Sequence, residues 1–351
     1  MTVESWGHIF SRLIAGEDLQ RASASWAMGQ IMSGEASEGQ IGAFMLALRS
    51  KGETVDELSG LVDVMLENSV VLNTGSDAVD IVGTGGDMVG TVNISSMAAI
   101  VAASAGIPVL KHGSRSASGK TGSAEMLEVL GIKLDLAPAQ VADVFRQVGI
   151  TFFFAPVFHP AMRFVAPVRK QLGVPTTFNF LGPLANPAQP RATALGVANQ
   201  EIAPIMAQEL ANRGRTALVM RSDDGLDELS TTARNRILVV AGGDVAAIEL
   251  DAQDYGLALA TQDQLIGGDA RHNAEVATKL FSGAAFENSQ AISDVVVLNA
   301  AAGIVAYELA RNPQIDVAGS FEGAIQRARA ALESGAANSK LVSWSAATIQ
   351  V

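Results

Sequence analysis

The sequence contains no cysteine among its 351 residues, which excludes disulfide bonds, cysteine-based zinc sites and thiol nucleophiles. Aromatic residues are also scarce, at 5%, and charged residues make up only 17%. The first four residues lack the basic start and apolar core of a signal peptide, and we find no apolar run long enough to span a bilayer. We therefore expect a soluble cytoplasmic protein with no membrane partner.

The chain has few positively charged residues: it contains 24 lysines and arginines and 36 aspartates and glutamates, which gives a net charge of −12. This balance argues against non-specific binding to nucleic acid or acidic lipid. Basic residues nevertheless gather in two stretches, Lys111–Lys120 and Arg163–Lys170. A basic focus on an acidic chain favours a small anionic ligand, although scattered solvated charges would explain any single one of these residues.

Glycine and apolar residues are plentiful, with 34 glycines and 48% hydrophobic residues, which is typical of a compact α/β enzyme. Residues 4–70 carry apolar residues at helical spacing, whereas strands and helices alternate from Val79 onward, which predicts a mostly parallel sheet. The predicted fold class is α/β, with a helical domain at 1–75, joined by a helical segment near 160–190, and a larger α/β domain at 76–351. The helices expected in the first domain are Glu4–Ala15, Arg21–Met32, Glu38–Arg49 and Val55–Glu67.

The expected strands of the second domain are Ala78–Val82, Ile107–Leu110, Thr151–Ala155, Ala192–Val197 and Thr216–Met220, followed by an antiparallel addition from Thr232–Val240 and Val245–Leu250. A single helix is expected at Ala161–Leu172, opened by His159-Pro160. The stretch Phe178–Pro187 is interpreted as a proline-pinned loop that serves as a hinge or connector. The expected tail helices are Ala270–Phe281, Gln290–Leu309, Phe321–Ser334 and Ser339–Ala346.

The stretch Asp80–Ser96 carries the strongest chemical signal. A β-branched run ends in Gly83, and further glycines follow at once, so the backbone can turn sharply and present bare N–H groups. Asn93, Ser95 and Ser96 then suit the start of a helix. Strand, glycine turn and helix N-terminus together favour an anion, although an ordinary tight turn shares the glycines.

Acidic residues beside this turn indicate a metal ion. Asp87 follows the glycines directly, and an acidic group beside a phosphate site usually needs a divalent cation between them. Asp227 and Glu228 stand next to each other after a predicted strand, in a cleft expected to be open to solvent. Their carboxylates are hard oxygen ligands that suit Mg²⁺, and a solvated acidic turn is the simpler alternative.

The loop after the second predicted strand, from Lys111 to Glu125, is polar and glycine-rich. Its Gly119-Lys120-Thr121 resembles part of a P-loop, but Gly113 and Gly119 enclose five residues where that motif has four. We therefore reject a nucleotide-triphosphatase and expect a loop that folds over a charged ligand. His112 is interpreted as structural rather than as a general base.

Four motifs taken together resemble the anthranilate phosphoribosyltransferase family over nearly the whole chain. The motifs are Gly83–Asp87 with Asn93–Ser96, Lys111-His112-Gly113, Arg169 with Phe178–Leu184, and Asp224–Glu228. The resemblance implies the nucleoside-phosphorylase-like fold, a homodimer formed through the helices, and transfer of phosphoribose from 5-phosphoribosyl 1-pyrophosphate to anthranilate in tryptophan biosynthesis.

The resemblance also implies site residues. The donor site would comprise Gly83, Gly86, Asp87, Thr91, Asn93, Ile94, Ser95 and Ser96, together with a closing loop of Lys111, His112, Gly113, Ser114, Arg115, Ser116, Ala117, Ser118, Gly119 and Ser123. The acceptor would contact Gly83, Ser114 and Arg169. Ser95 and Glu228 would hold one Mg²⁺, and Asp227 with Glu228 a second.

The chain departs from the family pattern at two places. Ser114 stands where the family usually has an asparagine that contacts anthranilate, and Arg221-Ser222 stands where it often has His-Gly. Two alternatives remain: a pyrimidine nucleoside phosphorylase of the same fold, which would need no metal pair, and a non-catalytic nucleic-acid-binding relative, which the net charge disfavours. A Rossmann dehydrogenase is weaker, because the glycines lack the spacing of the dinucleotide fingerprint.

Overall fold

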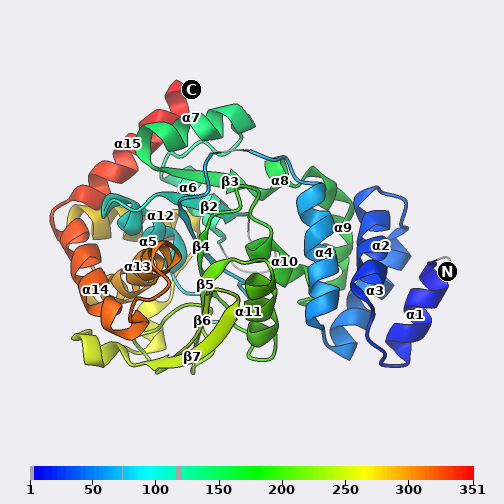
Figure 1. The fold of residues 1–351 in the computed structure, drawn as a ribbon. Helices are drawn as coiled ribbons and strands as arrows, with labels where there is room; N and C mark the ends of the chain where they lie inside the picture. Colours follow the sequence, from blue (N-terminus) through cyan, green and yellow to red (C-terminus); the bar gives the residue numbers. More distant parts are fainter. Residues whose placement is uncertain (1–3, 73, 116–120) are drawn as a thin grey trace.

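A bundle of helices lies beside a larger α/β unit in this molecule (Figure 1). The computed structural model describes residues 4–72, 74–115 and 121–351. The bundle contains α1 (Trp6–Ile14), α2 (Arg21–Met32), α3 (Glu38–Lys51) and α4 (Val55–Glu67). Both α3 and α4 begin with a capping box, formed by Ser37 with Gln40 and by Thr54 with Glu57, which satisfies the first free backbone N–H groups of each helix.

The larger unit is built on a seven-stranded sheet with the order β3-β2-β1-β4-β5-β6-β7. Its strands are β1 (Val79–Gly83), β2 (Val109–Gly113), β3 (Ile150–Phe154), β4 (Ala192–Gly196), β5 (Thr216–Ser222), β6 (Asn235–Ala241) and β7 (Asp244–Leu250). The first five are parallel, and β6 and β7 add in antiparallel fashion. The predicted α/β class with a mostly parallel sheet is confirmed.

Helices cover both faces of this sheet, as a parallel sheet requires. The remaining helices are α5 (Ile94–Ser104), α6 (Ser123–Val129), α7 (Pro138–Val148), α8 (Ala155–Phe158), α9 (Ala166–Leu172), α10 (Phe178–Leu184), α11 (Ile202–Asn212), α12 (Ala270–Ser282), α13 (Ser289–Arg311), α14 (Val317–Glu333) and α15 (Ala336–Gln350). One core holds α5 and α13 against β1, with Ile81 pointing toward them. A second core joins the bundle to α11 and to Val82 on the opposite face. Because Ile81 and Val82 are adjacent, β1 contributes to both cores by the alternation of a strand.

The longest helix, α13, meets the length and composition of a membrane span, which the sequence analysis did not expect of any segment. However, 83% of its apolar window is buried inside the protein. Gly303 permits this burial, because a Cβ there would lie 2.4 Å from Cδ1 of Ile81 on the sheet. The apolar composition of α13 therefore reflects its place in the core.

Two expectations for the middle of the chain are wrong. The single helix at Ala161–Leu172 is divided into a 3₁₀ helix, Pro160–Phe164, and α9, with Val165 between them. The expected loop at Phe178–Pro187 begins with α10, which tolerates Pro183 near its end. Buried side chains on α9 and α10, including Val168 and Leu181, pack with the N-terminal helices, and this packing stabilises helices that the local sequence does not favour.

Candidate active site

A cavity of about 700 Å³ opens at the carboxyl ends of the central strands. Here β1 has β2 on one side and β4 on the other, so the chain order reverses and loops from neighbouring strands diverge. Such a switch point is where open α/β sheets bind ligands. The cavity is lined by the turn after β1, by the end of β2, by α9 and α10, by Asp227 and Glu228, and by the segment 266–273.

Two glycines at adjacent strand ends allow the acidic loop to lie directly on the sheet. Gly83 of β1 and Gly196 of β4 are register partners. A Cβ at Gly83 would lie 2.2 Å from Oδ2 of Asp227, and one at Gly196 would lie 1.5 Å from the backbone oxygen of Asp227. Gly85 then donates its N–H to Oδ2 of Asp227 over 2.7 Å. The position of Asp227 therefore depends on residues without a side chain at both strand ends.

Three carboxylates converge at this point. One oxygen from each of Asp87, Asp227 and Glu228 lies within 4.8 Å of the others. Burial raises the pKa of all three groups, that of Asp227 to about 7, and each is raised further by the charge of another acidic residue. Oε2 of Glu228 is buried and has no hydrogen-bond partner in the described chain. We call these residues the acidic cluster; its three clustered carboxylates, offset by the single charge of Lys111, fit a divalent cation.

The cluster was expected in a cleft open to solvent. Asp227 lines the open cavity although it is only 6% exposed. Asp87, expected both to contact the donor and to indicate a metal ion, lies with the two predicted metal ligands. Ser95, the remaining predicted ligand, lines the same cavity.

Lys111 belongs to β2 rather than to a loop. It is 2% exposed, and its Nζ donates to the backbone oxygen of Ile81 over 2.5 Å and to Oγ of Ser95 over 3.4 Å. Burial lowers the pKa of Lys111 to about 8, while the charges of Asp80 and Glu228 act to raise it. This lysine therefore supplies one positive charge to the floor of the cavity.

His112 is held as a neutral ring. Its Nδ1 donates to the backbone oxygen of Gly182 over 3.0 Å, and its ring centroid lies 5.1 Å from that of His159. Burial lowers the pKa of His112 to about 3 and that of His159 to about 4. Nε2 of His159 donates to the backbone oxygen of Ala185 over 2.9 Å, just after α10 ends. Through Gly182 and Ala185 the two histidines therefore hold α10 against the end of β2.

Arg169 is the one predicted acceptor contact that carries a charge. It lies on α9 and lines the cavity, and burial lowers the pKa of its guanidinium. Within the described chain this side chain has no ion pair or hydrogen bond. Arg163 is exposed instead, with its guanidinium 4.6 Å from the ring centre of Phe164. An arginine without a counter-ion at a cavity wall suits an incoming carboxylate.

The other predicted donor residues divide into three groups. Gly86, Thr91, Asn93, Gly113, Ser114, Arg115 and Ser123 line the cavity. Ile94 and Ser96 are buried in α5 and do not line the cavity, and the N–H of Ile94 already donates to the backbone oxygen of Val92 over 2.7 Å. Ser116, Ala117, Ser118 and Gly119 lie outside the described residues.

Several lining residues were not predicted. Phe178, Asn179, Gly182 and Pro183 come from α10, and Ile266, Gly268 and Asn273 come from the start of α12 and the segment before it. The Gly267-Gly268 doublet is the sequence signal that could have found the second group, because paired glycines can mark a place where two backbone segments approach closely. The structure shows such an approach: a Cβ at Gly267 would lie 2.7 Å from the backbone oxygen of Thr91.

Comparison with known proteins identifies relatives over the full length. Residues 8–69 match the helical bundle domain of a glycosyl transferase family, and residues 75–338 match the α/β domain of that family. An anthranilate phosphoribosyltransferase of Leifsonia xyli is 52% identical, covering 98% of this chain and 99% of its own, and one of Nocardioides is 50% identical, covering 99% of both.

Solved structures agree with this assignment. The anthranilate phosphoribosyltransferase of Thermus thermophilus superposes with a TM-score of 0.87 at 37% identity, covering 97% of this chain and 99% of that one. The Saccharomyces cerevisiae enzyme, solved in complex with PRPP and Mg, shares the fold at 24% identity with a TM-score of 0.87, covering 99% of this chain and 98% of that one.

Proposed function

Since this chain belongs to the anthranilate phosphoribosyltransferase family, we propose that it transfers phosphoribose from 5-phosphoribosyl 1-pyrophosphate to the amine of anthranilate, releasing pyrophosphate. This reaction is a step of tryptophan biosynthesis. One observation carries the proposal: a single cavity brings together the acidic cluster, a glycine turn with a helix N-terminus, and the guanidinium of Arg169, which has no partner among the described residues.

The donor side suits a pyrophosphate. Residues of the turn after Gly83 line the cavity, as do Asn93 and Ser95 at the N-terminus of α5, and backbone amides with a helix dipole favour negative charge there. Asp87, Asp227 and Glu228, with Ser95, would hold Mg²⁺, and we propose two ions. When bound, this metal neutralises the pyrophosphate and orients it as a leaving group.

The acceptor side suits an aromatic acid. Arg169 would pair with the anthranilate carboxylate and so fix the direction of the amine. An aromatic amine is already a nucleophile, so its orientation against the ribose provides much of the acceleration. We assign no general base, because burial lowers the pKa of His112 to about 3, which makes its ring a weak base, and the amine needs only to be positioned.

The protein is further proposed to be a cytoplasmic homodimer that associates through its N-terminal helices, with its domain boundary near residue 75. Two exposed apolar side chains on α1 and α3 support such a contact: Ile14 is 82% exposed and Leu46 is 43% exposed. The two family matches, which end at residue 69 and begin at residue 75, support the boundary.

The decisive experiment is an assay of the purified chain with anthranilate, 5-phosphoribosyl 1-pyrophosphate and Mg²⁺, following the loss of anthranilate fluorescence. We expect turnover that stops on chelation with EDTA and returns with Mg²⁺. Metal-independent phosphorolysis of a pyrimidine nucleoside would instead indicate the phosphorylase, which the family relatives do not favour. Salt-sensitive DNA binding without turnover would indicate the non-catalytic alternative.

A further inference from the structure

Four hydrogen bonds form a closed ring beside the donor turn. Nδ2 of Asn273 donates to Oδ1 of Asn93 over 2.9 Å, and Nδ2 of Asn93 donates to the backbone oxygen of Thr121 over 3.4 Å. Oγ1 of Thr121 donates to the backbone oxygen of Gly268 over 2.9 Å, and the N–H of Gly268 donates to Oδ1 of Asn273 over 2.8 Å. Each member both donates and accepts, so the four bonds tie the members together in one arrangement.

The ring joins three parts of the cavity wall. Asn93 stands at the N-cap position of α5 and lines the cavity together with Ser95 of the first helical turn. Thr121 stands at the end of the polar loop that follows β2, and Gly268 immediately precedes the N-cap of α12. Backbone contacts bring the third part close, because Val92 donates to Leu265 over 2.9 Å and Gly267 donates to Gly90 over 2.9 Å.

Asn273 is the hub of this ring. Its side chain is 1% exposed, and both ends of its carboxamide are used. Removing the carboxamide leaves Oδ1 of Asn93 and the N–H of Gly268 without these partners at part-buried positions beside the cavity. The side chain of Asn93 would then be free to rotate. The hydrogen bond from Nδ2 of Asn93 to the backbone oxygen of Thr121 would be lost with it.

We propose that Asn273 is a positioning residue for the donor: through Asn93 it fixes the start of α5, and through Gly268 it fixes Thr121 and the end of the polar loop. The inference rests on the proposed function. A residue that only stabilised α12 would change the unfolding free energy without a preference for one substrate. A residue that orders the pyrophosphate site changes donor use and leaves acceptor use alone, because Arg169 lies on α9, outside the ring.

Asn273→Ala tests this distinction. We expect the KM for 5-phosphoribosyl 1-pyrophosphate to rise roughly three- to tenfold, with the KM for anthranilate unchanged within about twofold. Calorimetric binding of 5-phosphoribosyl 1-pyrophosphate with Mg²⁺, without anthranilate, should weaken by the same factor. Asn273→Asp keeps the acceptor for Gly268 and loses the donor to Asn93, so it should share the defect.

Thr121→Val removes a second bond of the ring at a partly exposed position, which keeps the proposal testable if Asn273→Ala does not fold. We expect the KM for the donor to rise two- to fivefold. In the double variant with Asn273→Ala, the free-energy cost of donor binding should not exceed about the sum of the two single costs, since bonds of one ring are not independent. The matched control is Ala277→Gly, one turn further along α12 and fully buried. It weakens the same helix but should leave both KM values unchanged.

The outcomes separate the two claims. If the wild type does not convert anthranilate, the proposed function fails. If the wild type is active and the Asn273 and Thr121 variants raise both KM values equally, or neither, Asn273 is a structural residue and this inference is overturned.

Discussion

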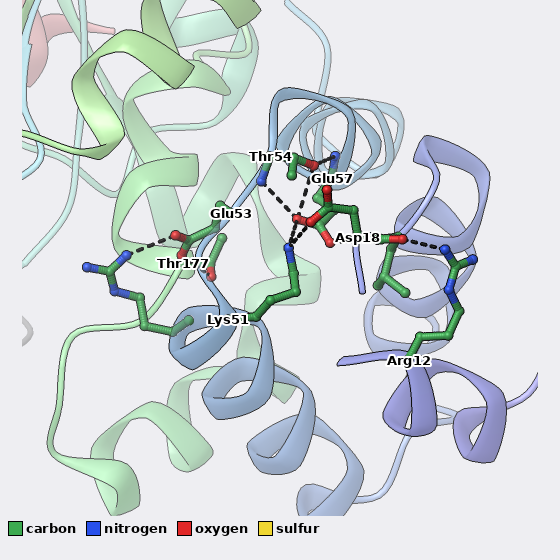
Figure 2. Close-up of polar contacts among 9 residues, drawn as sticks. Arg12, Asp18, Lys51, Glu53, Thr54, Glu57 and Thr177 are labelled. Atoms are coloured by element: carbon green, nitrogen blue, oxygen red, sulfur yellow. Dashed lines mark hydrogen bonds and ion pairs between the residues drawn. The ribbon is translucent and has the colours of Figure 1, made fainter. Parts of the chain in front are cut away.

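Two groups of buried charges in this protein have opposite designs. In the helical bundle, Nζ of Lys51 lies 2.7 Å from Oδ1 of Asp18 and 3.0 Å from Oε2 of Glu57, and Glu57 also accepts the N–H groups of Thr54 and Leu19, each over 2.8 Å (Figure 2). We call Asp18, Lys51, Thr54 and Glu57 the bundle network. The acidic cluster instead has three carboxylates, with Lys111 as the cation that offsets Glu228.

The difference separates stability from function. Every charge of the bundle network has a partner supplied by the chain, so removing Lys51 leaves the carboxylate of Glu57 buried without its cation. The acidic cluster holds like charges that repel one another, and Arg169 stands without a partner in the described chain. Such unpaired charges cost stability and are retained where a ligand completes them.

Neutralising the acidic cluster gives the largest expected effect. Asp227→Asn combined with Glu228→Gln should lower kcat roughly 10³-fold, because the residues that would hold Mg²⁺ are lost. Without metal, the variant should be at least as stable as the wild type at pH 8, since the repulsion is gone. Steady-state assays and denaturant unfolding in EDTA measure the two effects, and near-normal turnover would contradict the metal assignment.

The same cluster predicts a pH dependence. The folded pKa of Asp227 is raised to about 7, above its unfolded value, so the folded state binds this proton more tightly. The resulting stability is present at low pH and is lost as the pH rises through about 7. The free energy of unfolding of the metal-free wild type should therefore fall between pH 5 and 8 more steeply than that of the double variant.

Breaking the bundle network tests the opposite side of the comparison. Lys51→Met should lower the free energy of unfolding by about 3–5 kcal/mol, because Glu57, which is fully buried, loses its cation. The folded fraction should keep its kcat and its Mg²⁺ dependence. Lys279→Met is the control: it breaks an exposed pair with Glu275 and should leave the free energy of unfolding nearly unchanged. If Lys51→Met changed the kcat of the folded fraction, the bundle network would contribute to catalysis as well as to stability.

Gly196→Ala tests the acidic cluster without touching a charge. The added Cβ would meet the backbone oxygen of Asp227 at 1.5 Å, so the peptide that carries both carboxylates must move. We expect kcat to fall about 10²-fold, since a displacement of about 1 Å has this cost in a catalytic site. Gly323→Ala on α14, where no atom lies within 4 Å, should have no effect. Comparable loss in both variants would assign the effect to general destabilisation.

Arg169→Ala examines the unpaired positive charge. The KM for anthranilate should rise roughly 10- to 100-fold, the contribution of hydrogen bonds to a charged group, with little change in the donor KM. Arg163→Ala, which removes an exposed guanidinium of the same segment, is the control. Equal effects of the two substitutions would remove Arg169 from the acceptor site.

Ser114→Asn has the smallest expected effect, because it adds a neutral contact at the exposed edge of the cavity. One hydrogen bond contributes about 0.5–1.5 kcal/mol, so the KM for anthranilate should fall roughly two- to tenfold. The donor KM should not change. A higher KM for anthranilate would show that the larger side chain is crowded at this position.

The sequence predicted most elements because their signals are local. The helix at Val55–Glu67 and the break to strands near Val79 follow from periodicity and caps. Phe178–Pro187 was interpreted wrongly, because Pro183 argues against a helix and only packing on the bundle overrides it.

The candidate site was predictable where its residues are adjacent in sequence. Asp227 and Glu228 were found as neighbours, but nothing local indicates that Gly83 and Gly196 enclose Asp227 or that Asp87 approaches it. Asn273 could not be predicted, because its partner Asn93 is 180 residues away.

That separation has a consequence during synthesis. The ring at Asn93 cannot close until Asn273 has been translated, 180 residues later. At about 5–20 residues per second, this interval lasts roughly 9–36 s. For that time the nascent chain carries the start of α5 without its C-terminal support, so the ring can order the donor turn only after Asn273 has emerged.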